Sequence, residues 1–279
     1  MKIQKDVSLK EFTSIKIGGI AKIMYIPESI EEMILLSDSI TSPYFVGGGS
    51  NLLINNRCYD NVIDLRFFSQ SIENIGEGKF KVGASVRLQK LINYINQEGY
   101  GGIEYLFSVP GLVGGAVVMN AGRGRNHNKC ISDYIISVDI IRDKKLMTIT
   151  KEDCGFEYRS SSFKNTNDIV VSVLFEFPMM SEEESTAAKK ERINLCREKQ
   201  DNSFPNFGTV FMVANPRIMA FAKKIKIGNK RVHFSKKTSN WLINEGGGTY
   251  KDAISAIKKV EFLHKLFGKK CKREVIVWE

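Results

Sequence analysis

The sequence lacks the features that mark several large classes of protein. None of its apolar runs reaches the roughly 18 residues that a membrane-spanning helix needs. The opening segment, Met1–Phe12, contains no apolar core of a signal peptide. No arginine-rich arm, C2H2 zinc-finger spacing or aromatic RNA-binding motif is present. We therefore expect a cytoplasmic protein with no membrane span and no nucleic-acid partner.

Cysteine is scarce, and its spacing excludes the usual structural uses of the thiol. The count is odd, and no two cysteines stand at the CxxC spacing of a zinc or redox motif. A disulfide framework and a metal site are therefore not expected, and a reducing compartment is the natural setting. The five cysteines are Cys58, Cys130, Cys154, Cys196 and Cys271.

Acidic residues are outnumbered, and this imbalance favours anionic partners. The chain has 41 Lys and Arg against 31 Asp and Glu, which gives a formal net charge of +10. Nucleic acid, acidic lipid and phosphorylated small molecules are all attracted by such a surface. The basic residues are scattered, with short clusters at Lys223–Lys226, Lys236–Lys237 and Lys269–Arg273. A solvated basic surface is the simplest interpretation, and a phosphate-bearing substrate remains open.

Helical and strand patterns alternate along the 279 residues and predict an α+β fold. The predicted helices are Glu28–Asp38, Arg87–Glu98, Glu182–Gln200 and Thr249–Phe267, the last with a Thr249/Asp252 capping box. The predicted strands are Ala21–Ile26, Pro43–Val46, Asn61–Leu65, Lys79–Val82, Tyr134–Arg142, Met147–Thr150, Ile169–Phe177 and Glu274–Trp278. The charged helix after Pro178 marks a predicted domain boundary, with a smaller α/β part beyond it.

Three consecutive glycines follow a short apolar strand in the run Val46-Gly47-Gly48-Gly49-Ser50-Asn51. Glycine lets the backbone approach a phosphate with no Cβ in the way, and consecutive backbone N–H groups can form an anion-binding nest. Ser50 and Asn51 can add side-chain hydrogen bonds. The run is neither GxGxxG nor followed by a Walker lysine, so alone it fits a phosphate loop or a tight turn equally well.

A second glycine-rich loop follows about sixty residues later. It reads Ser108-Val109-Pro110-Gly111-Leu112-Val113-Gly114-Gly115-Ala116 and is followed by Asn120-Ala121-Gly122. Proline fixes one φ angle, and the small residues leave room for a flat ring or a pyrophosphate against the backbone. Close packing of two backbones explains the glycines equally well. Two such loops beside strands make a bipartite cofactor site the favoured interpretation.

These motifs, taken in order, resemble the family of UDP-N-acetylenolpyruvoylglucosamine reductases. The resemblance starts with Lys16-Ile17-Gly18-Gly19 and the two glycine-rich loops, and covers nearly the whole chain. It continues through Phe156–Lys164, Phe204–Phe211 and Arg273–Val275, at the length of the shorter type of the family. It implies a two-lobed FAD-binding domain of the vanillyl-alcohol-oxidase type, with a smaller C-terminal α/β substrate domain. The implied domains are residues 1–65, 66–178 and 179–279, with the C-terminal strand returning to the active site.

The resemblance also implies a reaction. NADPH reduces a non-covalent FAD, which passes hydride to the enolpyruvyl group of a UDP-sugar, in a monomer or weak dimer. Arg159 matches the arginine that binds the substrate carboxylate, and a guanidinium suits a carboxylate because it binds with two parallel hydrogen bonds. Thr209 matches the proton donor, which is usually serine. Glu274 matches the glutamate that polarises the enol ether or helps to deliver the proton. The cofactor loops are Val46–Asn51, Ser108–Gly115 and Asn120–Gly122.

Several positions depart from the family pattern and leave the substrate open. Leu112 replaces a threonine, Met212 stands where a lysine, arginine or glutamine is usual, and Thr238 stands where histidine is usual. The asparagine-alanine-glycine turn is followed by Arg123 and the segment 124–127 in place of tyrosine-glycine. The alternatives are a paralogue that reduces another nucleotide-activated sugar or a secondary metabolite, and a flavin-binding protein without turnover. Retention of Arg159, a hydroxyl at 209 and Glu274 argues against the latter.

Overall fold

The computed structural model describes residues 1–123 and 129–279. The chain divides into two compact units. The first unit contains Met1–Ile3, Tyr25–Gly48 and Asn61–Asn194, and the second contains Gln4–Met24, Gly49–Asp60 and Leu195–Glu279. Each unit has its own core of buried apolar side chains.

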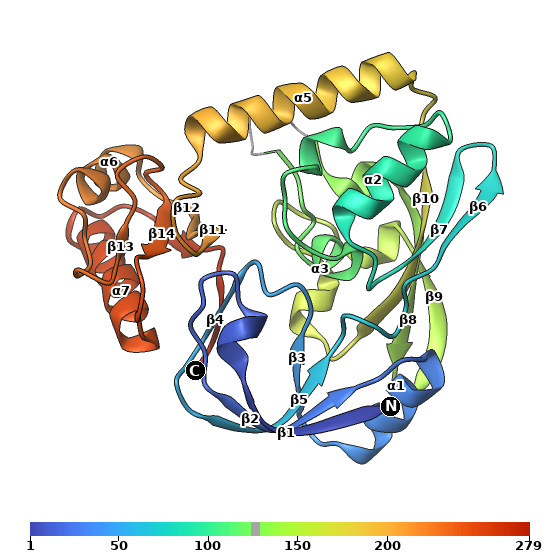
Figure 1. The fold of residues 1–279 in the computed structure, drawn as a ribbon, viewed down its shortest axis with the longest axis horizontal. Coiled ribbons are helices and arrows are strands. Elements are labelled where there is room, and N and C mark those ends of the chain that lie inside the picture. Colours follow the sequence, from blue (N-terminus) through green and yellow to red (C-terminus); the bar gives the residue numbers. More distant parts are fainter. Residues whose placement is uncertain (124–128) are drawn as a thin grey trace. The chain divides into compact units, whose positions relative to one another are not determined.

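The first unit is built on a five-stranded sheet, coloured cyan to yellow-green in Figure 1. Every neighbouring pair of strands in it is antiparallel. Val173 in its central strand lies opposite Val82 on one side and Val138 on the other, so these apolar residues are in register across the sheet. In spatial order the strands are β6 (Ile72–Gly76), β7 (Lys79–Gly83), β10 (Ile169–Glu176), β8 (Ile135–Arg142) and β9 (Lys145–Thr150).

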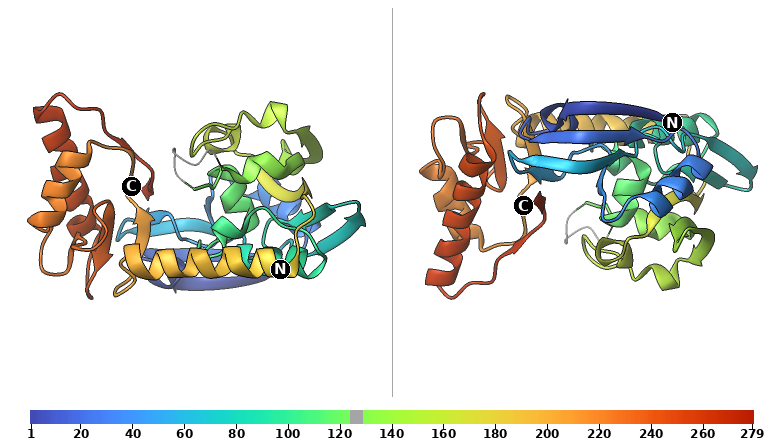
Figure 2. Two further views of the ribbon diagram at one scale, coloured as in Figure 1. Left: turned by 90° about the horizontal axis from the view of Figure 1, so that it is seen from above. Right: turned by 90° about the horizontal axis from the view of Figure 1, so that it is seen from below.

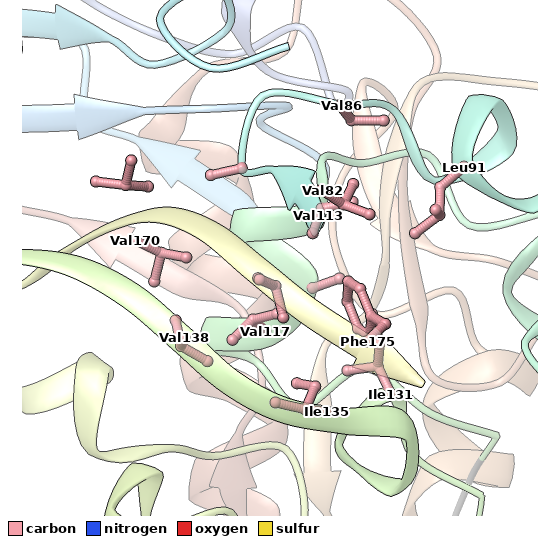
Figure 3. Packing of buried hydrophobic residues seen from close by; sticks show 14 of the residues in the cluster. Val82, Val86, Leu91, Val113, Val117, Ile131, Ile135, Val138, Val170 and Phe175 are labelled. Atoms are coloured by element: carbon pink, nitrogen blue, oxygen red, sulfur yellow. The ribbon is translucent and has the colours of Figure 1, made fainter. Parts of the chain in front are cut away.

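Two helices complete the core of this unit. Helix α2 (Leu88–Gln97) buries Leu88, Leu91, Ile92 and Ile95, which recur at helical spacing. The short helix α3 (Val113–Val118) packs on strands β7 and β10. Figure 3 shows Val113 and Val117 of α3 among Val82, Val138 and Phe175 of the sheet. This packing fixes the start of α3, which is also the end of the second glycine-rich loop.

A second, four-stranded sheet has the order β1-β2-β5-β3. Its strands are β1 (Lys2–Ser8), β2 (Ile20–Ile26), β5 (Cys58–Asp64) and β3 (Tyr44–Val46), and the points that divide the units fall within the first three. Strand β3 is parallel to β5, with Val46 opposite Asp64. Helix α1 (Ile30–Ser39) begins after Ser29, whose hydroxyl caps the helix by accepting the Glu32 N–H.

The C-terminal residues of the second unit form small sheets covered by two helices. Strands β11 (Asn206–Thr209), β14 (Trp241–Asn244) and β13 (Val232–Phe234) make one sheet in that order. Strand β12 (Phe211–Val213) pairs with β15 (Lys272–Arg273), and β16 (Ile276–Trp278) runs parallel to β4 (Leu52–Ile54). Helices α6 (Pro216–Lys224) and α7 (Tyr250–Leu266) pack against each other, as both views in Figure 2 show.

The remaining elements are one long helix and several single turns. Helix α5 (Glu182–Lys199) starts in the first unit and ends in the second. The short 3₁₀ turns are Leu9–Phe12, Glu104–Leu106, Ile131–Tyr134, Glu152–Cys154 and Ser162–Asn165. Among the described residues, no helix has the length and apolar character to cross a membrane.

The predicted helices and strands are confirmed, with ends that shift by a few residues. Helix α1 begins at Ile30 and not at Glu28, because Ser29 takes the capping position. The Thr249/Asp252 capping box is present at the start of α7. The α+β class is confirmed as well. The sequence patterns missed β1, β4, β6, α3, β11, β12, α6, β13, β14 and β15, most of which are short.

Candidate functional site

The two glycine-rich loops meet in the first unit, although sixty residues separate them. A Cβ added to Gly48 would lie 3.1 Å from the Cα of Gly111, and one added to Gly47 would lie 3.6 Å from Cδ1 of Leu112. The first contact is closer than most side chains make, so a larger residue at position 48 would need the Gly111 backbone to shift by a few tenths of an ångström. The bipartite site that the sequence suggested therefore has a physical basis at Gly47–Gly48 and Gly111–Leu112.

The first loop leaves its backbone donors available. Strand β3 ends at Val46, whose carbonyl accepts the Leu65 N–H at 2.8 Å. Within the described chain, the N–H groups of Gly47 and Gly48 donate to no backbone carbonyl. Both glycines are at least partly exposed. Free, adjacent N–H groups without side chains have the character of an anion-binding nest.

The second loop is fixed by hydrogen bonds on both sides of Leu112. The Gly111 carbonyl accepts the Leu88 N–H at 3.1 Å, and the Val113 N–H donates to Val86 at 2.9 Å. The Gly114 N–H donates to the Ala84 carbonyl at 2.9 Å. The loop is thus pinned to the start of α2 and the end of β7, which gives it a defined shape.

The two glycines at the start of α3 have different surroundings. A Cβ on Gly114 would lie 3.0 Å from that of Ala84, so this glycine allows close packing. Gly115 is exposed, and a Cβ there would meet nothing within 4 Å. The packing interpretation therefore holds for Gly114, while Gly115 presents open backbone of the kind that a flat ring could cover.

Ser108 and Pro110 lie on the opposite flank of the loop. The Ser108 hydroxyl accepts a hydrogen bond from Nε of Arg192 at 2.7 Å, and Lys189 lies 5.7 Å from the ring centre of Phe107. Helix α5 thus braces the residues that lead into the loop. Pro110 itself is exposed.

Asn120 connects the end of α3 with the segment that carries Arg159. The Asn120 side chain is 3% exposed, donates to the Glu157 carbonyl at 2.9 Å and accepts the Ser132 N–H at 3.4 Å. Its φ of 41° is in the left-handed region, which asparagine tolerates better than most residues. Ala121 is held by its N–H to the Ala116 carbonyl at 2.8 Å. His127, a candidate for covalent flavin attachment, lies outside the described residues.

Arg159 is held against this same loop. Its Nη1 donates to the Asn120 carbonyl at 3.3 Å and its Nη2 to the Gly122 carbonyl at 2.6 Å. The guanidinium carbon lies 5.3 Å from the ring centre of Tyr158. Its φ of 57° is unusual for arginine and costs free energy that the surrounding structure must supply, a pattern typical of functional sites. The structure therefore places a half-buried cation beside Asn120–Gly122.

The end of the first loop, Gly49–Asn51, belongs to the second unit and supports the C-terminal strand. Asn51 donates from Nδ2 to the Glu274 carbonyl at 3.1 Å, and its own carbonyl accepts the Ile276 N–H at 3.0 Å. Strand β16 continues beside β4 from Ile276 onward. Asn51 is thus a positioning residue for Glu274, a role that its pattern in the sequence did not suggest.

Gly49 cannot carry a side chain in this conformation. Its φ is 60°, and an added Cβ would lie 1.7 Å from the Phe12 carbonyl oxygen. We expect Gly49→Ala to lower the free energy of unfolding by more than the about 1–2 kcal/mol that left-handed backbone costs an alanine. The matched control is Gly268→Ala, which has the same φ of 60° but an added Cβ that meets nothing within 4 Å. Equal losses in chemical denaturation would show that the Phe12 contact is unimportant.

The backbones of Thr209 and Glu274 are linked through Val210, the residue that follows Thr209. Thr209 ends β11 opposite Trp241, and the next residue, Val210, accepts the Glu274 N–H at 2.8 Å. Both side chains are half-buried. Their backbones are therefore fixed to each other within the second unit, while Arg159 belongs to the first unit.

Asn240 is a residue that sequence reasoning missed. Its carbonyl accepts the Val210 N–H at 2.9 Å, its Oδ1 accepts the Phe211 N–H at 3.1 Å, and its Nδ2 donates to the Phe211 carbonyl at 2.7 Å. These three bonds fix the backbone immediately after Thr209. No local pattern reveals such a role, because the partners are about thirty residues apart in the sequence.

Thr238, at the position where the family usually has histidine, is engaged in the backbone. Its hydroxyl donates to the Lys199 carbonyl at 2.9 Å and accepts the Asp201 N–H at 2.9 Å. Nearby, the Ser235 hydroxyl donates to Asp201 at 2.5 Å. This cluster joins the end of α5 to the β13–β14 connection, so Thr238 has a structural role here.

The residues of the first unit fit a dinucleotide cofactor. The contact at Gly48 and Gly111 forms a narrow cradle that a Cβ would fill, and Gly115 offers open backbone beside it. In the second unit, the buried Ser14 hydroxyl has no hydrogen-bond partner among the described residues, while its N–H donates to Gly49. Small residues and available donors suit a pyrophosphate and a planar ring.

Comparison with known proteins defines the class first. Residues 22–145 match the FAD binding domain family. Together with the curated relatives given below, this match makes the chain an FAD-dependent oxidoreductase. A crystal structure of UDP-N-acetylenolpyruvylglucosamine reductase from Thermus caldophilus superposes over 100% of both chains with a TM-score of 0.83 at 24% identity, which confirms the fold.

Curated relatives then show the family. UDP-N-acetylenolpyruvoylglucosamine reductase from Carboxydothermus hydrogenoformans is 34% identical over 99% of this chain and 93% of its own. The enzyme of that name from Fusobacterium nucleatum is 30% identical over 99% of both chains. The chain belongs to the UDP-N-acetylenolpyruvoylglucosamine reductase family.

Proposed function

We propose that this protein reduces the enolpyruvyl group of UDP-N-acetylglucosamine enolpyruvate to give UDP-N-acetylmuramate, a precursor of peptidoglycan. The observation that supports it most strongly is the family match over nearly the full chain, in which relatives share a length and not only a cofactor domain. FAD, when bound, takes hydride from NADPH and passes it to the substrate. The protein's own residues bind, orient and supply a proton.

The cofactor residues that we propose are the three glycine-rich segments. A Cβ on Gly48 would lie 3.1 Å from the Cα of Gly111, closer than most side-chain contacts, and Gly115 leaves backbone exposed. The full set is Val46, Gly47, Gly48, Gly49, Ser50, Asn51, Ser108, Val109, Pro110, Gly111, Val113, Gly114, Gly115, Asn120, Ala121 and Gly122. We also propose that residues 1–178 contribute mainly to cofactor binding and residues 179–279 mainly to substrate binding.

The catalytic residues that we propose are Arg159, Thr209 and Glu274. A guanidinium that stays charged stabilises the negative charge that develops on the substrate carboxylate as hydride arrives at the β-carbon. The Thr209 hydroxyl donates the proton that completes the product at the α-carbon. A hydroxyl is a weak acid, so it can protonate only a strongly basic carbon, and Glu274 assists that transfer.

A second function is favoured by one observation. Thr238 replaces the usual histidine, and its hydroxyl binds Lys199 and Asp201. This position therefore offers the substrate no imidazole, and its hydroxyl already has two partners. A paralogue acting on another nucleotide-activated sugar would use the same flavin chemistry. Reoxidation of the reduced enzyme by a panel of UDP-sugar enol ethers separates the two functions, because only the first requires UDP-N-acetylglucosamine enolpyruvate to be the preferred oxidant.

We propose that the FAD is non-covalent, because no histidine or cysteine stands where family relatives with tethered flavin would carry one. Cys130 forms a β-bridge with Gly122, and burial and Asp133 raise the pKa of its thiol. Burial likewise raises the pKa values of Cys154 and Cys271 to about 11. Thiols with raised pKa values are poor nucleophiles at neutral pH. Acid or heat should therefore release all flavin into the supernatant. Flavin that stays with the precipitated protein would contradict this.

The setting that we propose is the cytoplasm, with the protein as a monomer or weak dimer. No disulfide joins any of the five cysteines, which suits a reducing compartment. Sedimentation of the purified holoprotein over a concentration series measures the oligomeric state, and a tight complex of higher order would contradict the proposal.

A further inference from the structure

The positive charge of this protein is concentrated at one end of the chain. Residues 201–279 carry 16 Lys and Arg and only six Asp and Glu, a surplus equal to the whole net charge of +10. Residues 1–200 carry equal numbers of both signs. The C-terminal part of the second unit therefore carries the whole net positive charge, while the charges of the rest of the chain cancel. It attracts anionic surfaces over a distance that the ionic strength sets.

Helices α6 and α7 form an apolar groove within this basic region. The groove has a volume of about 750 Å³ and includes Phe221 and Ile225 of the α6 end and Phe262 of α7. These three side chains are 48%, 53% and 63% exposed. Large apolar side chains exposed together in one patch are uncommon on a surface with no partner.

Four lysines line the groove, and one of them, Lys226, lies 3.9 Å from Oε1 of Glu245. Among the described residues, no carboxylate forms an ion pair with Lys251, Lys258 or Lys259, all of which line it. The nearest acidic residues in sequence bind other groups: Asp252 accepts hydrogen bonds from Thr249 and Asn229, and Glu261 is bound by Arg273, with 2.7 Å between Oε2 and Nη2. The charges of Lys251, Lys258 and Lys259 are thus not neutralised by an ion pair within the described chain.

The apolar surface continues past the groove along α7. Leu266 and Phe267 are 65% and 62% exposed, and Lys269 and Lys270 follow them after Gly268. A bilayer can take up protruding apolar side chains without a fitted pocket for each of them, and the basic surroundings favour its anionic headgroups. Lysine stems can lie along apolar groups while their ammonium groups reach phosphates.

We propose that this surface, called here the α6–α7 face, binds an anionic lipid bilayer peripherally. It consists of Phe221, Ile225, Phe262, Leu266 and Phe267 with the surrounding lysines. Lysines hold the protein at the phosphates, and the apolar side chains enter the boundary between headgroups and acyl chains. The face lies within residues 179–279, for which we propose substrate binding, but none of its residues belongs to the proposed catalytic or cofactor set.

The test is sedimentation of the full-length, FAD-loaded protein with vesicles. We expect it to pellet with equal parts of phosphatidylglycerol and phosphatidylcholine at about 0.1 M salt, and to be released at about 1 M, where charges are screened within about 3 Å. Vesicles of phosphatidylcholine alone should bind at least about tenfold less. Equal binding to both compositions, or none to either, would overturn the proposal.

Variants separate the two contributions. Lys258→Glu with Lys259→Glu should lower binding to the mixed vesicles at least about tenfold, and Phe262→Ser with Leu266→Ser should lower it while leaving its salt dependence. The control is Lys145→Glu with Leu146→Ser on β9, where Leu146 is 52% exposed, and it should bind as the unaltered protein does. Losses equal to the control's would overturn the proposal.

Two further readouts identify the cause of a negative result. All three variants should keep NADPH-dependent turnover in the absence of vesicles, so loss of membrane binding and failure of the proposed reaction are observed separately. A second probe is a labelled helical peptide with one leucine face and one glutamate face. If this peptide binds the α6–α7 face and the mixed vesicles do not, the partner is an acidic protein and the lipid proposal is wrong.

Discussion

Replacing Thr209 with valine should slow the oxidation of reduced flavin by substrate about 10²–10⁴-fold, the range for loss of a general acid. Reduction of the flavin by NADPH should be unchanged, because the hydroxyl has no part in that step. Valine keeps the branched shape at the end of β11, so the pairing with Trp241 and the Val210 bond to Glu274 should persist. Rapid-mixing absorbance measurements of each half-reaction give the two rates.

Two companion variants make the Thr209 result specific. Thr209→Ser restores a hydroxyl and should recover most of the rate. Thr238→Val removes a hydroxyl that bonds only Lys199 and Asp201 in the described structure, so it should lower stability without a selective effect on the second half-reaction. An equal slowing of both half-reactions in Thr209→Val would refute its role as proton donor.

Replacing Arg159 with lysine should lower the same half-reaction about 10²–10³-fold, as expected when a preorganised donor to developing charge is lost. The guanidinium uses its fork to reach both the Asn120 and the Gly122 carbonyls, and an ammonium cannot repeat that geometry. Its left-handed φ of 57° costs conformational free energy, which the surrounding contacts must offset to hold Arg159 in place.

The control for Arg159 is an arginine of the same unit that grips a carboxylate. Arg142 bonds Asp168 through Nε at 2.9 Å and Nη2 at 2.7 Å, so Arg142→Lys also loses a fork. We expect that variant to retain turnover. Because Arg159 also holds the Asn120–Gly122 loop, flavin content is measured in both variants. Near-normal turnover in Arg159→Lys at full flavin content would count against the assignment.

Much of the fold follows from local patterns in the sequence. The apolar stripe of α2 and the capping box of α7 each depend on residues that lie within one or two helical turns of each other. Both can therefore be recognised in the sequence. Strand β4 shows no such local sign. It is stabilised by β16, more than two hundred residues away, and three-residue strands carry too little alternation to be recognised.

The candidate site divides in the same way. The glycines of both loops are visible in the sequence, and their order matches that of the family. Only the structure shows that Gly48 lies against Gly111. Asn51 is recognised in the sequence only as part of the first loop, and Asn240 is not recognised at all; their positioning roles come from backbone partners at Glu274 and Phe211. Local reasoning cannot find such residues, because it does not see which distant carbonyls they reach.

The central claim is that reduced flavin in this protein passes its electrons to UDP-N-acetylglucosamine enolpyruvate. The most direct test reduces the FAD-loaded protein with one equivalent of NADPH without oxygen, adds that substrate, and follows flavin absorbance. The account predicts rapid reoxidation and one equivalent of UDP-N-acetylmuramate. Flavin that is reduced readily but stays reduced in the presence of this substrate would contradict it.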